Sequence, residues 1–153
     1  MILKKFFFII SLYLIGVIVP MAETVSLMTH KSLSFERLWV RPSTGPNTAA
    51  YITITNSGDQ PERLIKVESA DAATVELHNH IEEDGVMKMR PVSFIEIGAD
   101  AVEMKPGGLH IMLMGLKESF QSKKAIPLTL HFEKAGKVDI TFSVKTSPDE
   151  PAA

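Results

Sequence analysis

Apolar side chains alternate with polar ones along most of the chain after residue 33, and this period of two is the strongest constraint on the fold. Between Tyr51 and Thr55, for example, Ile52 and Ile54 alternate with hydroxyl-bearing residues. Such alternation places the apolar side chains on one face of a β-strand. It recurs in residues 63–69, 74–80, 85–92, 110–114, 127–134 and 138–145, and turn-forming residues occur at 56–59, 105–108 and 135–137. Because no segment between 34 and 146 has apolar residues at helical spacing, the sequence predicts a single all-β sandwich of about 110 residues.

The first 22 residues have the layout of a secretory leader. Lys4 and Lys5 precede an apolar run over 6–19, which is short for a transmembrane helix, and Ala22 is a small residue suited to cleavage. Pro20 is unfavourable near that cut, so an uncleaved N-terminal anchor is the alternative to a signal peptide. We expect residues 1–22 to direct export, 23–33 to be a linker, 33–146 to form the domain, and 147–153 to be a disordered tail.

Composition argues against several classes of function. Export predicts an oxidising compartment, yet the sequence has no cysteine, so we expect the fold to depend on its packed core, with no lipid attachment at a cysteine. Without residues 1–22 the chain has 14 basic and 18 acidic residues, a net charge of −4, which disfavours a nucleic-acid partner. A hydrolytic enzyme is the weakest class, because there is no G-x-S-x-G motif and no cysteine nucleophile.

Histidine and methionine gather in two of the alternating segments. His78 precedes the acidic segment 82–84 and Met89 follows it, while His110 and Met112 point the same way on one strand, with Cα atoms roughly 6.5–7 Å apart. Neutral imidazole and thioether groups suit Cu(I) better than Zn(II), Ca(II) or Mg(II), whereas a blue-copper electron-transfer site needs a cysteine thiolate. If the chain folds back after His78, these four donors gather at one rim of the sandwich.

The same residues also have ordinary structural interpretations. Hydrophobic packing explains methionines in apolar strands, including Met87, Met89, Met112 and Met114. An edge position or solvated surface explains histidines on polar faces, including His78, His80, His110 and His131.

Three segments taken together resemble the periplasmic copper chaperones of the PCuAC family. They are WVRPSTGPNTAAYITITN at 39–56, VELHNHIEEDGVMKMRPV at 75–92, and MKPGGLHIMLMGLK at 104–117. The order of His78, ten intervening residues, Met89, and then the H-I-M of 110–112 is similar to the His/Met copper motif of that family. The resemblance covers residues 33–145, which is nearly the whole predicted domain.

The resemblance implies a cupredoxin-like Greek-key β-sandwich that binds one Cu(I) ion through His78, Met89, His110 and Met112. It implies an exported, periplasmic chaperone rather than an enzyme, which delivers copper to the assembly of respiratory cytochrome oxidase. The implied partners are a copper-accepting oxidase subunit or a thiol-containing copper chaperone, with membrane contact only through a retained N-terminal segment. The 20 residues between Met89 and His110 are slightly fewer than in the family pattern, which leaves Met87 as a substitute ligand. His80 is a further donor, especially toward Cu(II).

Two other functions stay open from the residues alone. One is an exported protein that binds Zn(II) or Cu(II) through His78, His80 and His110, with Glu82 or Glu83 completing the shell. The other is a metal-free exported scaffold or adhesion module, in which the methionines belong to the core.

Overall fold

The computed structural model describes residues 28–149, and every regular element in this part of the chain is a β-strand. The strands are β1 (Met28–His30), β2 (Leu33–Val40), β3 (Asn47–Asn56), β4 (Glu62–Glu68), β5 (Ala72–Glu83), β6 (Val86–Pro91), β7 (Ile95–Ile97), β8 (Val102–Glu103), β9 (His110–Leu116), β10 (Ala125–Phe132) and β11 (Gly136–Val144). The predicted leader (1–22) and residues 150–153 of the predicted tail lie outside the described residues. Residues 28–149 contain no helix that is long and apolar enough to cross a membrane.

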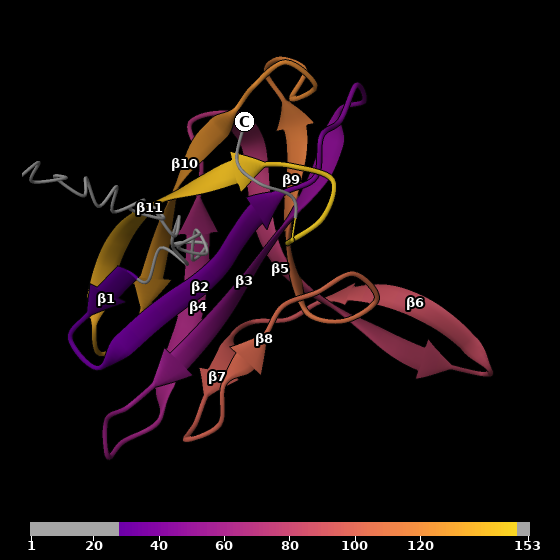
Figure 1. The fold of residues 1–153 in the computed structure, drawn as a ribbon. Coiled ribbons are helices and arrows are strands. Elements are labelled where there is room, and N and C mark those ends of the chain that lie inside the picture. Colours follow the sequence, from indigo (N-terminus) through magenta and orange to yellow (C-terminus); the bar gives the residue numbers. More distant parts are fainter. Residues whose placement is uncertain (1–27, 150–153) are drawn as a thin grey trace, which may run out of the picture.

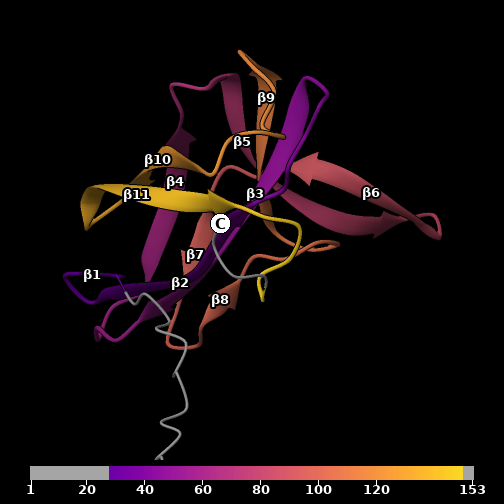
Figure 2. The same cartoon turned by 45° about the horizontal axis from the view of Figure 1, so that its top comes forward.

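The strands form one continuous mixed sheet that curls over its own core (Figures 1 and 2). The hydrogen-bonded order is β6-β5-β9-β3-β2-β11-β10-β4-β7, while β1 and β8 pair off this path with β2 and β3. Among these pairs only β11 and β2 run parallel. β7, the last strand in this order, lies against β3, which is in the middle of the order. The Asn56 side chain at the end of β3 donates to the carbonyl of Ile97 on β7 at 3.3 Å. The prediction of an all-β single domain is confirmed.

The seven strands predicted from alternation are present, but some boundaries differ. Glu82 and Glu83 of the acidic segment belong to strand β5, and only Asp84 and Gly85 form the turn between β5 and β6. Both turn residues have positive φ, 55° and 76°, as a two-residue hairpin with an Asp-Gly sequence requires. The predicted linker at 23–33 is also wrong in part, because β1 pairs with the start of β2.

The apolar side chains at alternating strand positions form the core, as the sequence predicts. On β9, Ile111 and Leu113 are fully buried, and on β3 so are Ile52 and Ile54. Each such side chain contributes roughly 1.5–3 kcal/mol relative to an exposed position. Other fully buried side chains come from β2, β4, β7, β10 and β11 and from one loop: Leu33, Phe35, Leu64, Ile97, Phe120, Ile126, Leu128 and Phe142. Met104 is also in this core, with 3% of its surface exposed.

The hairpin of β5 and β6 projects from the rest of the domain as an arm (Figures 1 and 2). β6 is the last strand at its end of the sheet, and it pairs only with β5. Its apolar side chains therefore stay largely outside the core, with Val86 57% and Met87 58% exposed.

One buried carboxylate joins β4 to the turn between β10 and β11. Glu62 is 5% exposed and accepts hydrogen bonds from the backbone N–H groups of Arg63, Lys134 and Ala135 at 2.8, 3.0 and 2.7 Å. Burial raises the pKa of this carboxyl, but the three backbone hydrogen bonds and the charge of Lys134 lower it by more in total. The pKa of Glu62 is therefore below its usual value in the folded protein.

We predict that Glu62→Gln destabilises the domain in a pH-dependent way. A lowered carboxyl pKa gives stability that is present above the unfolded pKa and lost as the pH falls through the folded pKa. The substitution should cost about 1–3 kcal/mol at pH 7 and distinctly less near pH 3. Urea unfolding at both pH values measures this cost. Glu133→Gln is the matched control, because the Glu133 carboxylate is in an exposed ion pair with Arg63. An equal cost of Glu62→Gln at both pH values would contradict the prediction.

Candidate metal centre

Four neighbouring strands place the predicted donors on one face of the sheet. The strands run in the order β6-β5-β9-β3, and paired residues project to the same side. Register pairs His80 with Met89, His78 with His110, and Ala49 with Met112. The structure therefore places all four residues that the sequence singled out on one face of the sheet, and His80 lies on the same face.

His110 is the most buried donor, with 3% of its surface exposed. Its Nδ1 lies 2.9 Å from the carbonyl oxygen of Gly108, so the tautomer that satisfies this acceptor carries the proton on Nδ1 and leaves the Nε2 lone pair free. Burial lowers the pKa of His110, the Gly108 contact raises it in part, and the nearby His80 and His78 lower it further. The imidazole is therefore held in the neutral form that binds metals.

His80 shares the same backbone acceptor. Its Nδ1 lies 3.3 Å from the Gly108 oxygen, and its ring centroid is 5.2 Å from that of His110. When Nδ1 of His80 donates to this carbonyl, the Nε2 lone pair of His80 is also free. The turn at 105–108 thus orients two imidazoles through one oxygen atom.

His78 lies opposite His110 in the β5–β9 pair, with ring centroids 5.6 Å apart. Its Nε2 is 2.8 Å from Oε2 of Glu76, and its Nδ1 is buried without a hydrogen-bond partner. Within residues 28–149, no other buried side-chain nitrogen or oxygen lacks a partner. Buried polar atoms are nearly always satisfied, so an orphaned imidazole nitrogen on the same face as the other donors fits a metal ligand.

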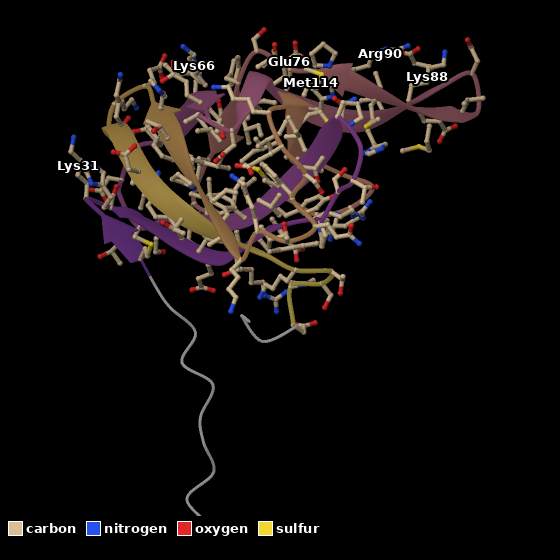
Figure 3. All side chains as sticks on the ribbon, turned by 90° about the horizontal axis from the view of Figure 1, so that it is seen from above. Lys31, Lys66, Glu76, Lys88, Arg90 and Met114 are labelled. Carbon is tan, nitrogen blue, oxygen red and sulfur yellow. The ribbon has the colours of Figure 1, made fainter. Side chains whose placement is uncertain are left out.

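The methionines of this face differ in exposure. Met89 is 47% exposed on the arm, and Met112 is partly buried on β9. Both line one cleft, whereas Met87, farther out on the arm, does not. Met114 is one step further along β9, opposite Thr74 and Asn47, and it does not line the cleft either. Figure 3 labels Met114 and Glu76 near the base of the arm, and Arg90 and Lys88 along it.

The cleft has a volume of ≈ 500 Å³ and one wall of donor side chains: His80, Met89, His110 and Met112. Residues 41–43, 47–49, 51 and 106–107 supply the rest of its lining. His78 does not line it, because its ring turns toward Glu76. Sequence reasoning treated His80 as secondary, although its position two residues after His78 put it on the same face of the strand.

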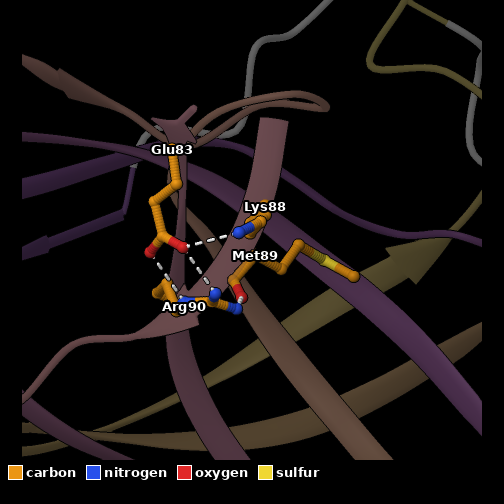
Figure 4. Close-up of polar contacts among 4 residues, drawn as sticks. All are labelled: Glu83, Lys88, Met89 and Arg90. Carbon is orange, nitrogen blue, oxygen red and sulfur yellow. Dashed lines mark hydrogen bonds and ion pairs between the residues drawn. The ribbon is translucent and has the colours of Figure 1, made fainter. Parts of the chain in front are cut away.

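The opposite face of the arm carries an ion cluster. Glu83 accepts hydrogen bonds from Lys88 at 3.0 Å and from Arg90 at 2.9 and 2.7 Å, and these hydrogen bonds lower the pKa of its carboxyl (Figure 4). The Met89 side chain points away from this cluster. The Glu83 carboxylate is therefore already paired with the side chains of two basic residues.

Donors for a hard or borderline metal are not assembled in the described residues. Within 28–149, no group of three or more His, Cys, Asp or Glu side chains is placed to hold a metal ion. His131 contacts Glu68 on β4 at 2.7 Å, and His30 lies 3.3 Å from the carbonyl oxygen of Ala135 in the turn between β10 and β11, so both rings have partners elsewhere.

The fold and this face together define a PCuAC-type β-domain, and comparison with known proteins agrees. A family model described as "Putative lipoprotein LpqE-like" matches residues 33–144, and the chain belongs to this family, which is of the PCuAC type. The chain is similar to the putative lipoprotein Lxx21020 of Leifsonia xyli subsp. xyli, with 28% identity over 71% of this chain and 67% of the relative. Its cupredoxin-like fold is confirmed.

Two solved structures show this likeness in three dimensions. The copper-bound PCuAC domain from PmoF2 is 30% identical, with a TM-score of 0.66 over 78% of this chain and 97% of that one. The solution structure of CuI-DR1885 from Deinococcus radiodurans is 26% identical, with a TM-score of 0.56 over 79% of this chain and 81% of that one.

Gly115 controls how closely β9 approaches β5 at the end of the site. It has φ 64°, and a Cβ atom built on it would lie 2.9 Å from the Cβ of Ala73. We predict that Gly115→Ala destabilises the domain by about 1–3 kcal/mol, because it adds both backbone strain and a steric clash. Gly98→Ala is the control, since Gly98 has no atom within 4 Å of such a Cβ. Thermal or urea unfolding that gave the two variants equal stability would contradict the prediction.

Proposed function

We propose that this protein is an exported, periplasmic copper carrier that binds one Cu(I) ion through His78, Met89, His110 and Met112. The observation that carries the proposal is the buried, unpartnered Nδ1 of His78 on a face shared with one further imidazole and two thioethers at predicted ligand positions. Two similar solved structures, the copper-bound PCuAC domain from PmoF2 and CuI-DR1885, support the choice of metal.

The donor set favours Cu(I) for chemical reasons. Thioether sulfur is soft and uncharged, and neutral imidazole completes a set that a hard cation would not select. Four neutral ligands leave the ion with its single positive charge, so the protein does not trap it electrostatically. His80 adds a nitrogen donor on the same face, which suits Cu(II) if the ion is oxidised.

The exposure gradient across the site supports a carrier rather than an enzyme. His110 is nearly inaccessible, whereas Met89 is about half exposed on the projecting arm. A partner with thiolate ligands reaches Met89 first and displaces the donors one at a time toward His110. We propose that the acceptor is an oxidase subunit under assembly or a thiol-containing copper chaperone.

Replacing one thioether tests the site. We expect Met112→Leu to weaken Cu(I) binding by at least about tenfold and to leave the fold intact, because Leu keeps the volume and removes the sulfur donor. Competition with a Cu(I) chelator gives the affinity, and X-ray absorption of the loaded protein should show a mixed nitrogen and sulfur shell. Met114→Leu is the matched control on the same strand face. A copper coordination shell without sulfur in the unmodified protein would contradict the proposal.

Glu76 should act through His78 by holding its Nε2 and directing Nδ1 to the metal. We expect Glu76→Ala to weaken Cu(I) binding by about tenfold, and Glu76→Gln to restore most of it, since the amide oxygen still accepts the hydrogen bond. Chelator competition measures the affinities, and nitrogen NMR shifts of the imidazole report the tautomer of His78. Glu82→Ala, on the same face farther out along β5, is the control. Equal affinity for Glu76→Ala and Glu82→Ala would exclude this positioning role.

A further inference from the structure

The cleft beside the copper donors contains a cation without a carboxylate partner. Arg41 lines this cleft, and no carboxylate within residues 28–149 pairs with its guanidinium. The other arginines of this region all contact acidic side chains: Arg37 with Glu103, Arg63 with Glu96 and Glu133, and Arg90 with Glu83. An arginine left unpaired in a concave site is suited to bind an anion.

Backbone contacts fix Arg41 next to the metal ligands. Its N–H donates to the carbonyl of Ala49 at 3.0 Å, and Ala49 is the register partner of Met112. Its own carbonyl accepts from the hydroxyl of Thr48 at 2.6 Å. The charge of Arg41 also acts on Tyr51, where it lowers a phenol pKa that burial raises, and the Tyr51 ring lies 6.5 Å from the ring of His110.

This placement is electrostatically unfavourable for a copper site with neutral ligands only. A Cu(I) ion bound by two imidazoles and two thioethers keeps its positive charge, and a guanidinium on the same cleft repels it. An anion in the cleft would offset both charges. The volume of ≈ 500 Å³ is that of a small-molecule site and is far larger than a single ion requires.

We propose that this cleft seats the small anionic thiol compound that carries Cu(I) to the protein, with its carboxylate on Arg41 and its copper–thiolate end against Met89, Met112 and His110. This inference rests on the proposed copper-carrier function. In the transfer step, the copper–thiolate bond breaks as copper–thioether and copper–imidazole bonds form. Copper stays Cu(I) throughout, and the released thiolate takes a proton from water.

The test compares two Cu(I) sources that differ in charge. The full chain is mixed with Cu(I) as its glutathione complex, which carries carboxylates, or as its acetonitrile complex, which carries none. We expect Arg41→Gln to slow uptake from the glutathione complex by about fivefold to tenfold and not to slow uptake from the acetonitrile complex, because that complex is a cation that the guanidinium repels. Arg37→Gln is the matched control, because it removes the same charge outside the cleft, and Arg41→Lys should retain most of the rate.

A second measurement needs no substitution. S-methylglutathione has the same carboxylates and cannot bind copper as a thiolate, so it should compete with the glutathione complex and not with the acetonitrile complex. Equal effects of Arg41→Gln on both copper sources, or no competition by S-methylglutathione, would overturn the inference and leave the copper-carrier function standing. Failure of the unmodified protein to take up Cu(I) from acetonitrile would overturn both.

Discussion

The pairing of β5 with β9 is the interaction on which the site depends. It places His78 opposite His110, and the outer neighbours β6 and β3 bring Met89 and the cleft wall to the same face. The reverse face of the same two strands carries Leu77, Ile111 and Leu113, which are 4%, 0% and 0% exposed. A slip of one residue would exchange these two faces, so the hydrophobic core holds the donors in register. The buried core face and the face that carries the candidate donors are thus two consequences of one alternation.

Sequence periodicity predicts this division of faces, but it does not predict which residues are direct neighbours. Folding back after His78 brings Met89 to the same face, but Met89 pairs with His80, and His78 pairs with Pro91. The reason is the turn: Asp84 and Gly85 alone reverse the chain, so Glu82 and Glu83 extend the strand. Turn length sets hairpin register, and a run of acidic residues gives little information about it.

Two further parts of the fold were not predictable from alternation. β2 interrupts its own pattern, because register shifts between Glu36 and Trp39 and Arg37 adopts φ 53°. The cleft wall at 41–49 joins the donors only through long-range pairing of β3 with β9. A backbone irregularity and a long-range contact leave no periodic signal in the sequence, so the role of Arg41 could come only from the structure.

Burial divides the site into a fixed part and a movable part, and this division bears on how copper leaves. His110 is buried and held by the Gly108 carbonyl, so it cannot reorient without breaking a hydrogen bond. Met89 is on an arm whose opposite face carries the ion pairs of Glu83 with Lys88 and Arg90, and its flexible thioether is 47% exposed. In the carrier that we propose, an incoming ligand would displace this mobile donor first, and the buried imidazole would hold the ion until a second bond had formed. Such an order would allow transfer without releasing free Cu(I), and it would require the outer donor to be weak, neutral and exposed, as Met89 is.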